Sequence, residues 1–72
     1  MENKEIKETI KEILAKEKQA TQYDIKAERC LIKRDEEGYN YYKEYANELW
    51  QDVYVTKAWL TDYMKQEGEF DV

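Results

Sequence analysis

The large apolar residues near the N-terminus recur at the spacing of one helix face. Offsets of four, seven and eight residues place them on a single stripe, while Glu and Lys alternate on the remaining positions. The pattern predicts an amphipathic helix over residues 3–18. Its apolar stripe consists of Ile6, Ile10, Ile13 and Leu14. The polar segment 16–22 lacks a large apolar residue, and we expect the helix to break there.

Two structures compete for the segment after this break. Thr21 and Asp24 are spaced like a capping box, which favours a second helix that starts at Thr21 and is ended by Gly38 as a left-handed cap. The alternative is a β-hairpin over residues 30–45, with a turn at 35–38. The adjacent acids of that turn favour the hairpin, because the C-terminal end of a helix repels negative charge. The helix is our first expectation.

Helical spacing returns in the second half of the chain. Asn40 is a suitable N-cap, and residues 41–52 are expected to form a third helix. The strand-favouring segment 53–55 predicts an interruption, after which Thr56 is expected to cap a last helix that ends at Gly68. The side chains expected in the core of this half are Tyr42, Tyr45, Leu49, Trp59, Leu60 and Tyr63.

The expected fold class is therefore mostly α, a single small domain of three to four short helices. An α+β, winged-helix-like domain is the alternative if residues 30–45 form the hairpin. The single domain, residues 1–72, has two parts that differ in net charge and in their number of aromatic rings. Residues 1–38 hold nine basic and ten acidic side chains and read as a near-neutral helical scaffold, whereas residues 39–72 hold three basic and seven acidic side chains and nine of the ten aromatic rings.

The composition excludes most catalytic and metal chemistry. The chain of 72 residues has no histidine, so it lacks the commonest general base and the usual nitrogen ligand of zinc. Its single cysteine, Cys30, leaves no disulfide within the chain and favours a reducing compartment, for which the cytoplasm is our expectation. No run approaches the roughly 18 apolar residues of a membrane span. We expect no enzyme activity, no metal, no cofactor and no membrane partner.

The acidic, aromatic half favours binding to another protein. Tyr and Trp bury a large area at the cost of few torsions, and they anchor many protein interfaces. Interleaved carboxylates suit a partner with a basic surface. The residues that we expect to bind this partner are Tyr39, Tyr41, Glu44, Glu48, Trp50, Asp52, Tyr54 and Asp62.

In size, charge and composition the chain is similar to small acidic proteins of phages and other mobile elements that inhibit nucleases. This similarity implies an inhibitor or adaptor that blocks a nucleic-acid-handling protein, as a nucleic-acid mimic. A homodimer is a further expectation, because Ile6, Ile10 and Ile13 have the spacing of a short coiled coil, which Glu17 would end.

Residues 10–31 resemble the first helices of a helix-turn-helix or winged-helix protein, in which a helix, a short polar turn and a Thr-capped helix follow in order. The resemblance implies a DNA-binding regulator as the alternative function. Its phosphate contacts would be Lys26, Arg29, Lys33 and Arg34. The net charge of −5 opposes this alternative, because phosphate neutralisation supplies most non-specific affinity for DNA.

Overall fold

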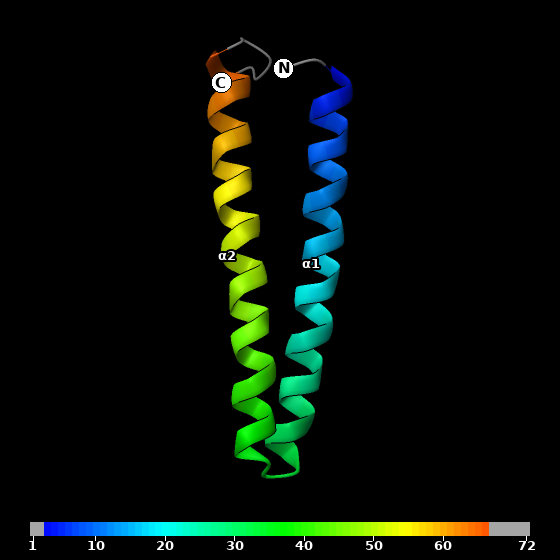
Figure 1. Ribbon diagram of the computed structural model, residues 1–72, viewed down its shortest axis with the longest axis vertical. Coiled ribbons are helices and arrows are strands. Elements are labelled where there is room, and N and C mark those ends of the chain that lie inside the picture. Colours follow the sequence, from blue (N-terminus) through cyan, green and yellow to red (C-terminus); the bar gives the residue numbers. More distant parts are fainter. Residues whose placement is uncertain (1–2, 67–72) are drawn as a thin grey trace.

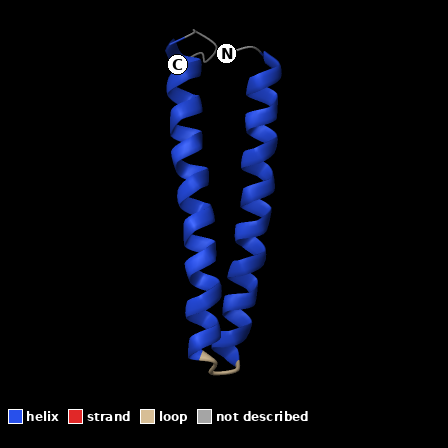
Figure 2. Cartoon of the chain, in the orientation of Figure 1, coloured by secondary structure: helices blue, strands red, loops and turns tan. Residues whose placement is uncertain are grey.

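The computed structural model describes residues 3–66, and over this range the chain forms two long antiparallel helices (Figure 1; Figure 2). Helix α1 spans Asn3–Ile32 and α2 spans Glu36–Gln66. The hairpin is elongated, with dimensions of 50 × 19 × 16 Å. The mostly-α class is confirmed. The three to four short helices are wrong, and the α+β alternative is wrong too, since residues 3–66 contain no strand.

The two helices pack through residues that are seven positions apart. The interior contains Ile6, Ile13, Ala20 and Ala27 from α1, facing Ala46, Val53 and Leu60 from α2. A half-buried residue follows each of these by three, and another precedes Ala46 by four, so both helices show the alternating 3,4 spacing of a coiled coil. The half-buried set is Thr9, Lys16, Tyr23 and Cys30 in α1, with Tyr42, Leu49, Thr56 and Tyr63 in α2.

The expected break at residues 16–22 is wrong, because the heptad continues through this polar segment. Ala20 is fully buried and occupies the interior position seven residues after Ile13. Glu17 and its neighbour Lys16 bridge to α2 instead of breaking the helix. Thr21 does not cap a new helix either, since its hydroxyl donates to the carbonyl of Glu17 one turn earlier, over a distance of 2.9 Å. Such a hydroxyl is satisfied within the helix and gives no signal to end it.

The expected interruption at residues 53–55 and the caps around it are also wrong. Val53 is fully buried between the helices, while Tyr54 and Val55 point to the surface from the same continuous helix. Asn40 and Thr56 lie inside α2 and cap nothing. Burial of the Val53 side chain outweighs the modest strand preference of the segment. The expected stop at Gly68 lies outside the described residues.

A tight turn joins the helices where the sequence allowed a β-hairpin. Arg34 has a left-handed backbone (φ 60°), and its amide donates to the carbonyl of Leu31. The amide of Asp35 donates to the carbonyl of Cys30 over 2.8 Å, which completes a Schellman motif. Asp35 then caps α2, because its carboxylate accepts a hydrogen bond from the amide of Gly38 over 3.0 Å. Arg34, not Gly38, is therefore the left-handed residue that ends a helix.

Gly38 allows a close approach at this turn from within the first turn of α2. A Cβ atom there would lie 2.8 Å from the sulfur of Cys30 and would also collide with the capping carboxylate of Asp35. The interior near the turn is small throughout, with Ala27 facing Ala46, whereas the open end holds Ile6 and Leu60. The helices accordingly converge toward the turn (Figure 1).

Candidate protein-binding surface

Helix α2 carries a second 3,4 pattern, which is exposed to solvent. We call these residues the α2 stripe: Tyr41, Tyr45, Glu48, Asp52, Val55, Trp59 and Asp62. Steps of four and three residues keep them on one side of the helix along six turns. The rings are accessible, with Tyr41 exposed by 56% and Trp59 by 51%. The stripe therefore offers rings and carboxylates together to anything that lies along α2.

Four tyrosine rings gather at the end of the stripe that is nearer the turn. Tyr41 meets Tyr45 edge to face at a centroid distance of 5.0 Å, and Tyr45 stacks on Tyr23 of α1 at 5.6 Å. The ammonium group of Lys26 lies 5.7 Å from the ring of Tyr42, which completes the cluster. The neighbouring Tyr41 hydroxyl raises the pKa of Tyr45 above its usual value. Mutual packing holds these rings in place while their edges remain exposed.

The structure divides the eight predicted partner-binding residues among different surfaces. Members of the α2 stripe are Tyr41, Glu48, Asp52 and Asp62, and Glu44 lines a shallow hollow beside them. Trp50 and Tyr54 belong to another side of α2, where their rings stack at 6.0 Å. Tyr39 is half-buried at the turn.

Sequence reasoning missed three members of the stripe. Tyr45 and Trp59 were expected in the core, but both are exposed, by 44% and 51%. Val55 was expected to interrupt the helix. The signal that identifies them is the heptad period of 3.5 residues per turn, which differs from the 3.6 residues per turn of an isolated helix. Only the heptad that contains Val53 and Leu60 places all three residues outside the interior.

Trp50 has a structural role that its type alone did not reveal. Its indole N–H donates to one carboxylate oxygen of Asp24 over 2.9 Å, and the ammonium group of Lys43 donates to the other over 3.1 Å. The Trp50 hydrogen bond and the Lys43 charge hold the pKa of Asp24 below its usual value, and Asp24 in turn raises the pKa of Lys43. These residues tie α1 to α2.

A groove runs from beside Asp24, Lys43 and Trp50 toward the open end of the hairpin. Ile10 and Leu14 line it from α1, and Thr61 and Met64 line it from α2, around a volume of about 620 Å³. An ion pair of 2.8 Å between Glu17 and Lys57 closes its inner end. Leu14 is 59% exposed, although its spacing placed it on the inward stripe. Together with Trp50 and Tyr54, these four residues form what we call the apolar face.

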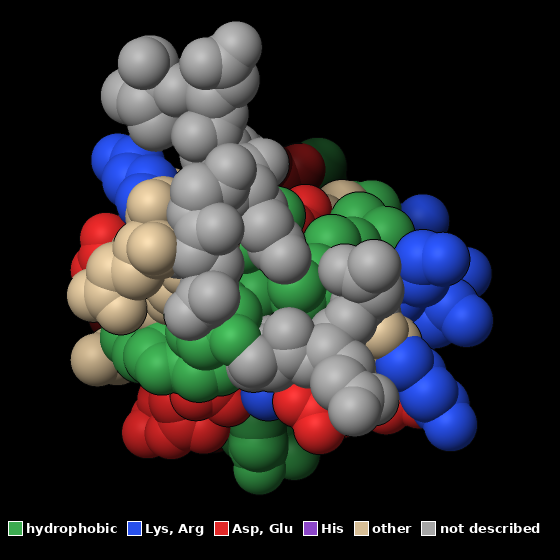
Figure 3. Space-filling view, turned by 90° about the horizontal axis from the view of Figure 1, so that it is seen from above, with side chains coloured by type: hydrophobic (Ala, Val, Ile, Leu, Met, Phe, Trp, Pro, Cys, Tyr) green, Lys and Arg blue, Asp and Glu red, His purple; other side chains and the backbone are tan. Residues whose placement is uncertain are grey.

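The charges are unevenly distributed around the hairpin. Seen from the open end, most of the visible Lys and Arg side chains lie over α1, and hydrophobic side chains are visible between the helices and at the surface (Figure 3). The four predicted DNA contacts, Lys26, Arg29, Lys33 and Arg34, all belong to the last turns of α1 and the loop. Residues 10–31 are one continuous helix, so the expected helix-turn-helix arrangement is wrong.

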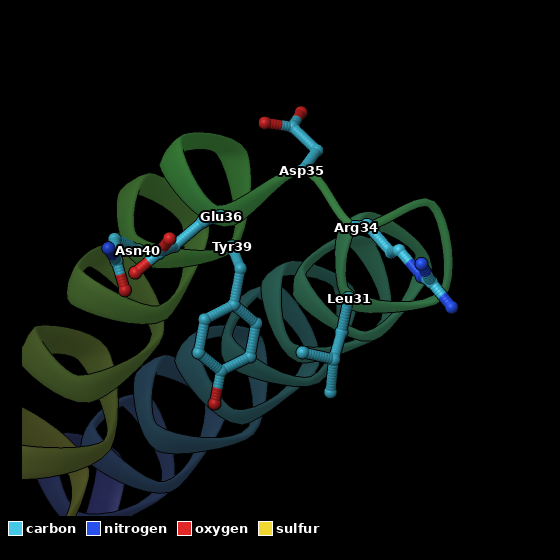
Figure 4. A pocket seen from close by; sticks show the side chains of 6 residues that line it. All are labelled: Leu31, Arg34, Asp35, Glu36, Tyr39 and Asn40. Atoms are coloured by element: carbon cyan, nitrogen blue, oxygen red, sulfur yellow. The ribbon is translucent and has the colours of Figure 1, made fainter.

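A shallow pocket of about 450 Å³ lies at the turn (Figure 4). Leu31 and Tyr39 point to the same side in it, whereas Arg34 and Asp35 point away from them and from each other. Its charged groups therefore do not converge on one point, as an active site would require. Among residues 3–66, no group of three His, Cys, Asp or Glu side chains is arranged to hold a metal ion.

The chain matches no protein-family model. No curated protein and no solved structure is significantly similar to it. Within residues 3–66, neither helix is long and apolar enough to cross a membrane.

Proposed function

We propose that this protein is a non-enzymatic protein-binding module that presents the α2 stripe to a partner with a basic surface. The observation that carries the proposal is that exposed rings and carboxylates share one side of α2 from Tyr41 to Asp62. Rings supply contact area, and carboxylates favour a basic partner and oppose an acidic one. The effect on the partner would be that of an inhibitor or adaptor.

The shape of the hairpin suits a helix-in-groove mode of recognition. The stripe extends over roughly 30 Å at the helical rise of about 1.5 Å per residue. Its anchors recur every three or four residues, as in other amphipathic helices that bind grooves. Because α1 already holds α2 in shape, little ordering entropy is lost on binding.

A basic groove that normally receives nucleic acid is the kind of partner we propose. Glu48 and Asp62 present carboxylates along one line, as a duplex presents phosphates, and Asp52 between them shares its carboxylate with Lys16 over 3.3 Å. A cytoplasmic location belongs to the same proposal, since the lone Cys30 suits a reducing compartment.

Comparative capture tests this function. The immobilised protein is used to recover binding proteins from the cytosol of its natural source, beside the double variant Y41A/W59A. We expect a basic protein to be retained by the original chain and reduced at least about tenfold by the variant, since interface rings contribute about 1–3 kcal/mol each. Removing two exposed rings should leave the helical circular dichroism unchanged.

Charge variants separate the carboxylates from the rings. E48Q/D62Q removes two charges from the stripe, and E8Q/E12Q removes two from exposed positions of α1 as a matched control. We expect only the first pair to slow association with the captured protein, and the difference to shrink in added salt. Equal retention by every variant would show that the stripe does not bind.

A further inference from the structure

The hairpin has only one layer of packed elements. Its radius of gyration is 16.0 Å, against about 11 Å for a compact domain of this length. Among the described residues, the largest side chain that is fully buried is Val53, and three of the seven buried residues are alanines. A core this small supplies little stability to a free monomer, and helical domains ordinarily bury such faces against a second layer.

We propose that the second layer is another copy of this chain, packed through the apolar face to form a four-helix bundle. The apolar face contains Ile10, Leu14, Trp50, Tyr54, Thr61 and Met64, from both helices. The whole broad side of a hairpin of 50 by 19 Å has a flat area of roughly 950 Å², which is large enough to hold the ~800 Å² that each partner buries in a standard interface.

The charges on this side specify how the two copies are oriented. Along the crease between the helices, α1 contributes the acids Glu17 and Asp24, and α2 contributes the bases Lys57 and Lys43. If both turns lie at the same end, a two-fold axis parallel to the helices places α1 of one copy over α2 of the other. Each carboxylate then has a lysine on two sides, and the charges alternate around the bundle.

The opposite orientation is disfavoured by the same charges. With the turns at opposite ends, α1 would lie antiparallel over α1, and overlap of the two apolar faces would bring Glu17, near the middle of the face, toward Glu17 of the other copy. Like charges would face one another, which costs free energy in a partly buried site. The parallel stack also joins the apolar open ends, so that Ile10, Leu14 and Met64 of both copies form one cluster.

This inference does not rest on the proposed function, because the α2 stripe and the apolar face share no residue. It is tested on the full chain by sedimentation equilibrium and by thermal melts over a range of about 1–500 μM. We expect a dimer whose melting temperature rises with concentration, as mass action requires. A chain that is monomeric throughout, with a constant melting temperature, would refute the proposal.

Two double variants identify the interface. L14Q/Y54Q replaces two exposed residues of the apolar face, and V55Q/W59Q replaces two comparably exposed residues of the α2 stripe. We expect the first to raise the concentration of half-dimerisation at least about tenfold and the second to leave it unchanged. The reverse result would place the interface on the stripe. If L14Q/Y54Q is unfolded, its folding at higher concentration still reports the coupling to association.

Spin labels distinguish the two orientations. In a C30S background, I32C places a label at a residue near the turn that is 82% exposed. With both turns at one end, the two labels should lie within roughly 30 Å, the width of a four-helix bundle. Labels more than roughly 40 Å apart would indicate opposite ends and overturn the charge argument.

Discussion

Arg34 occupies a backbone position that glycine adopts at lower cost. Its φ of 60° lies in the left-handed region, where a Cβ atom crowds the following carbonyl oxygen. The Schellman hydrogen bonds from Arg34 and Asp35 to the end of α1 hold the residue there. The strain is local, so relieving it should stabilise the hairpin without changing its structure.

The change R34G tests this. We expect the free energy of unfolding to rise by about 0.5–1 kcal/mol, since glycine removes the Cβ penalty. Urea denaturation followed by circular dichroism measures the change. The matched control is K33G, which places glycine at the preceding residue, whose φ is not left-handed, and should lower stability instead. A destabilising R34G would show that the Arg34 side chain outweighs the strain.

Asp24 links the helices through Trp50 and Lys43, and its lowered pKa makes that link depend on pH. The pKa of this carboxylate is lower in the folded chain than that of an ordinary aspartate, chiefly because it accepts the hydrogen bond from Trp50. Its contribution is therefore complete above the unfolded pKa and is lost as pH falls through the folded value.

The variant D24N isolates this contribution from the other carboxylates. We expect the original chain to be more stable than D24N by a constant amount above about pH 5, with the difference shrinking below about pH 4. Thermal melts of both proteins from pH 7 to pH 2 measure it. A difference that stays constant over the whole range would mean that the pKa of Asp24 is not lowered by folding.

At the scale of the helices, small residues in the half of the hairpin nearer the turn decide how closely α1 and α2 approach. Ala20 and Ala27 in α1 and Ala46 in α2 are all fully buried. A larger side chain at these positions would separate the helices and disturb the Asp24 group beside them. Alanine is required there by space and not by helix preference alone.

The variants A20L and A15L distinguish the need for space between the helices from the helix preference of alanine. Both place leucine for alanine in α1, but Ala20 is buried and Ala15 is exposed. We expect A20L to lower the free energy of unfolding by about 1–3 kcal/mol through overpacking, and A15L to change it by less than about 0.5 kcal/mol. Urea titration of both variants gives the comparison. A stabilising A20L would reveal unfilled space between the helices.

The same small residues explain why the sequence predicted that most of the chain is helical but also predicted breaks that the two long helices do not have. Ile6 and Ile13 were identified as inward-facing, and they are buried. Ala20 and Ala27 continue their heptad, but alanine is common on every face of a helix and gives no hydrophobic signal. Ile10 and Leu14 gave a strong signal for burial although the hairpin leaves them exposed.

The candidate surface was predictable by composition and only partly by position. The acidic, aromatic character of the second half is a property of the sequence, and Tyr41 and Tyr54 are exposed as expected. Which rings share a face depends on the register of α2 against α1, and that register is set by Val53, Ala46 and Leu60. The role of Trp50 could not be predicted from the local sequence, because its hydrogen bond to Asp24 joins residues 26 positions apart.

At the scale of the whole molecule, the antiparallel topology places Asn3 and Gln66 at the same end (Figure 1). A force that pulls these residues apart would separate the helices one heptad at a time, starting with the contacts of Ile6 and Leu60. Each step breaks only a few contacts, so the resistance at any moment is low. The alanine-lined turn, held by the Arg34 and Asp35 hydrogen bonds, would open last. The hairpin should therefore unfold at low force when it is pulled by its two ends.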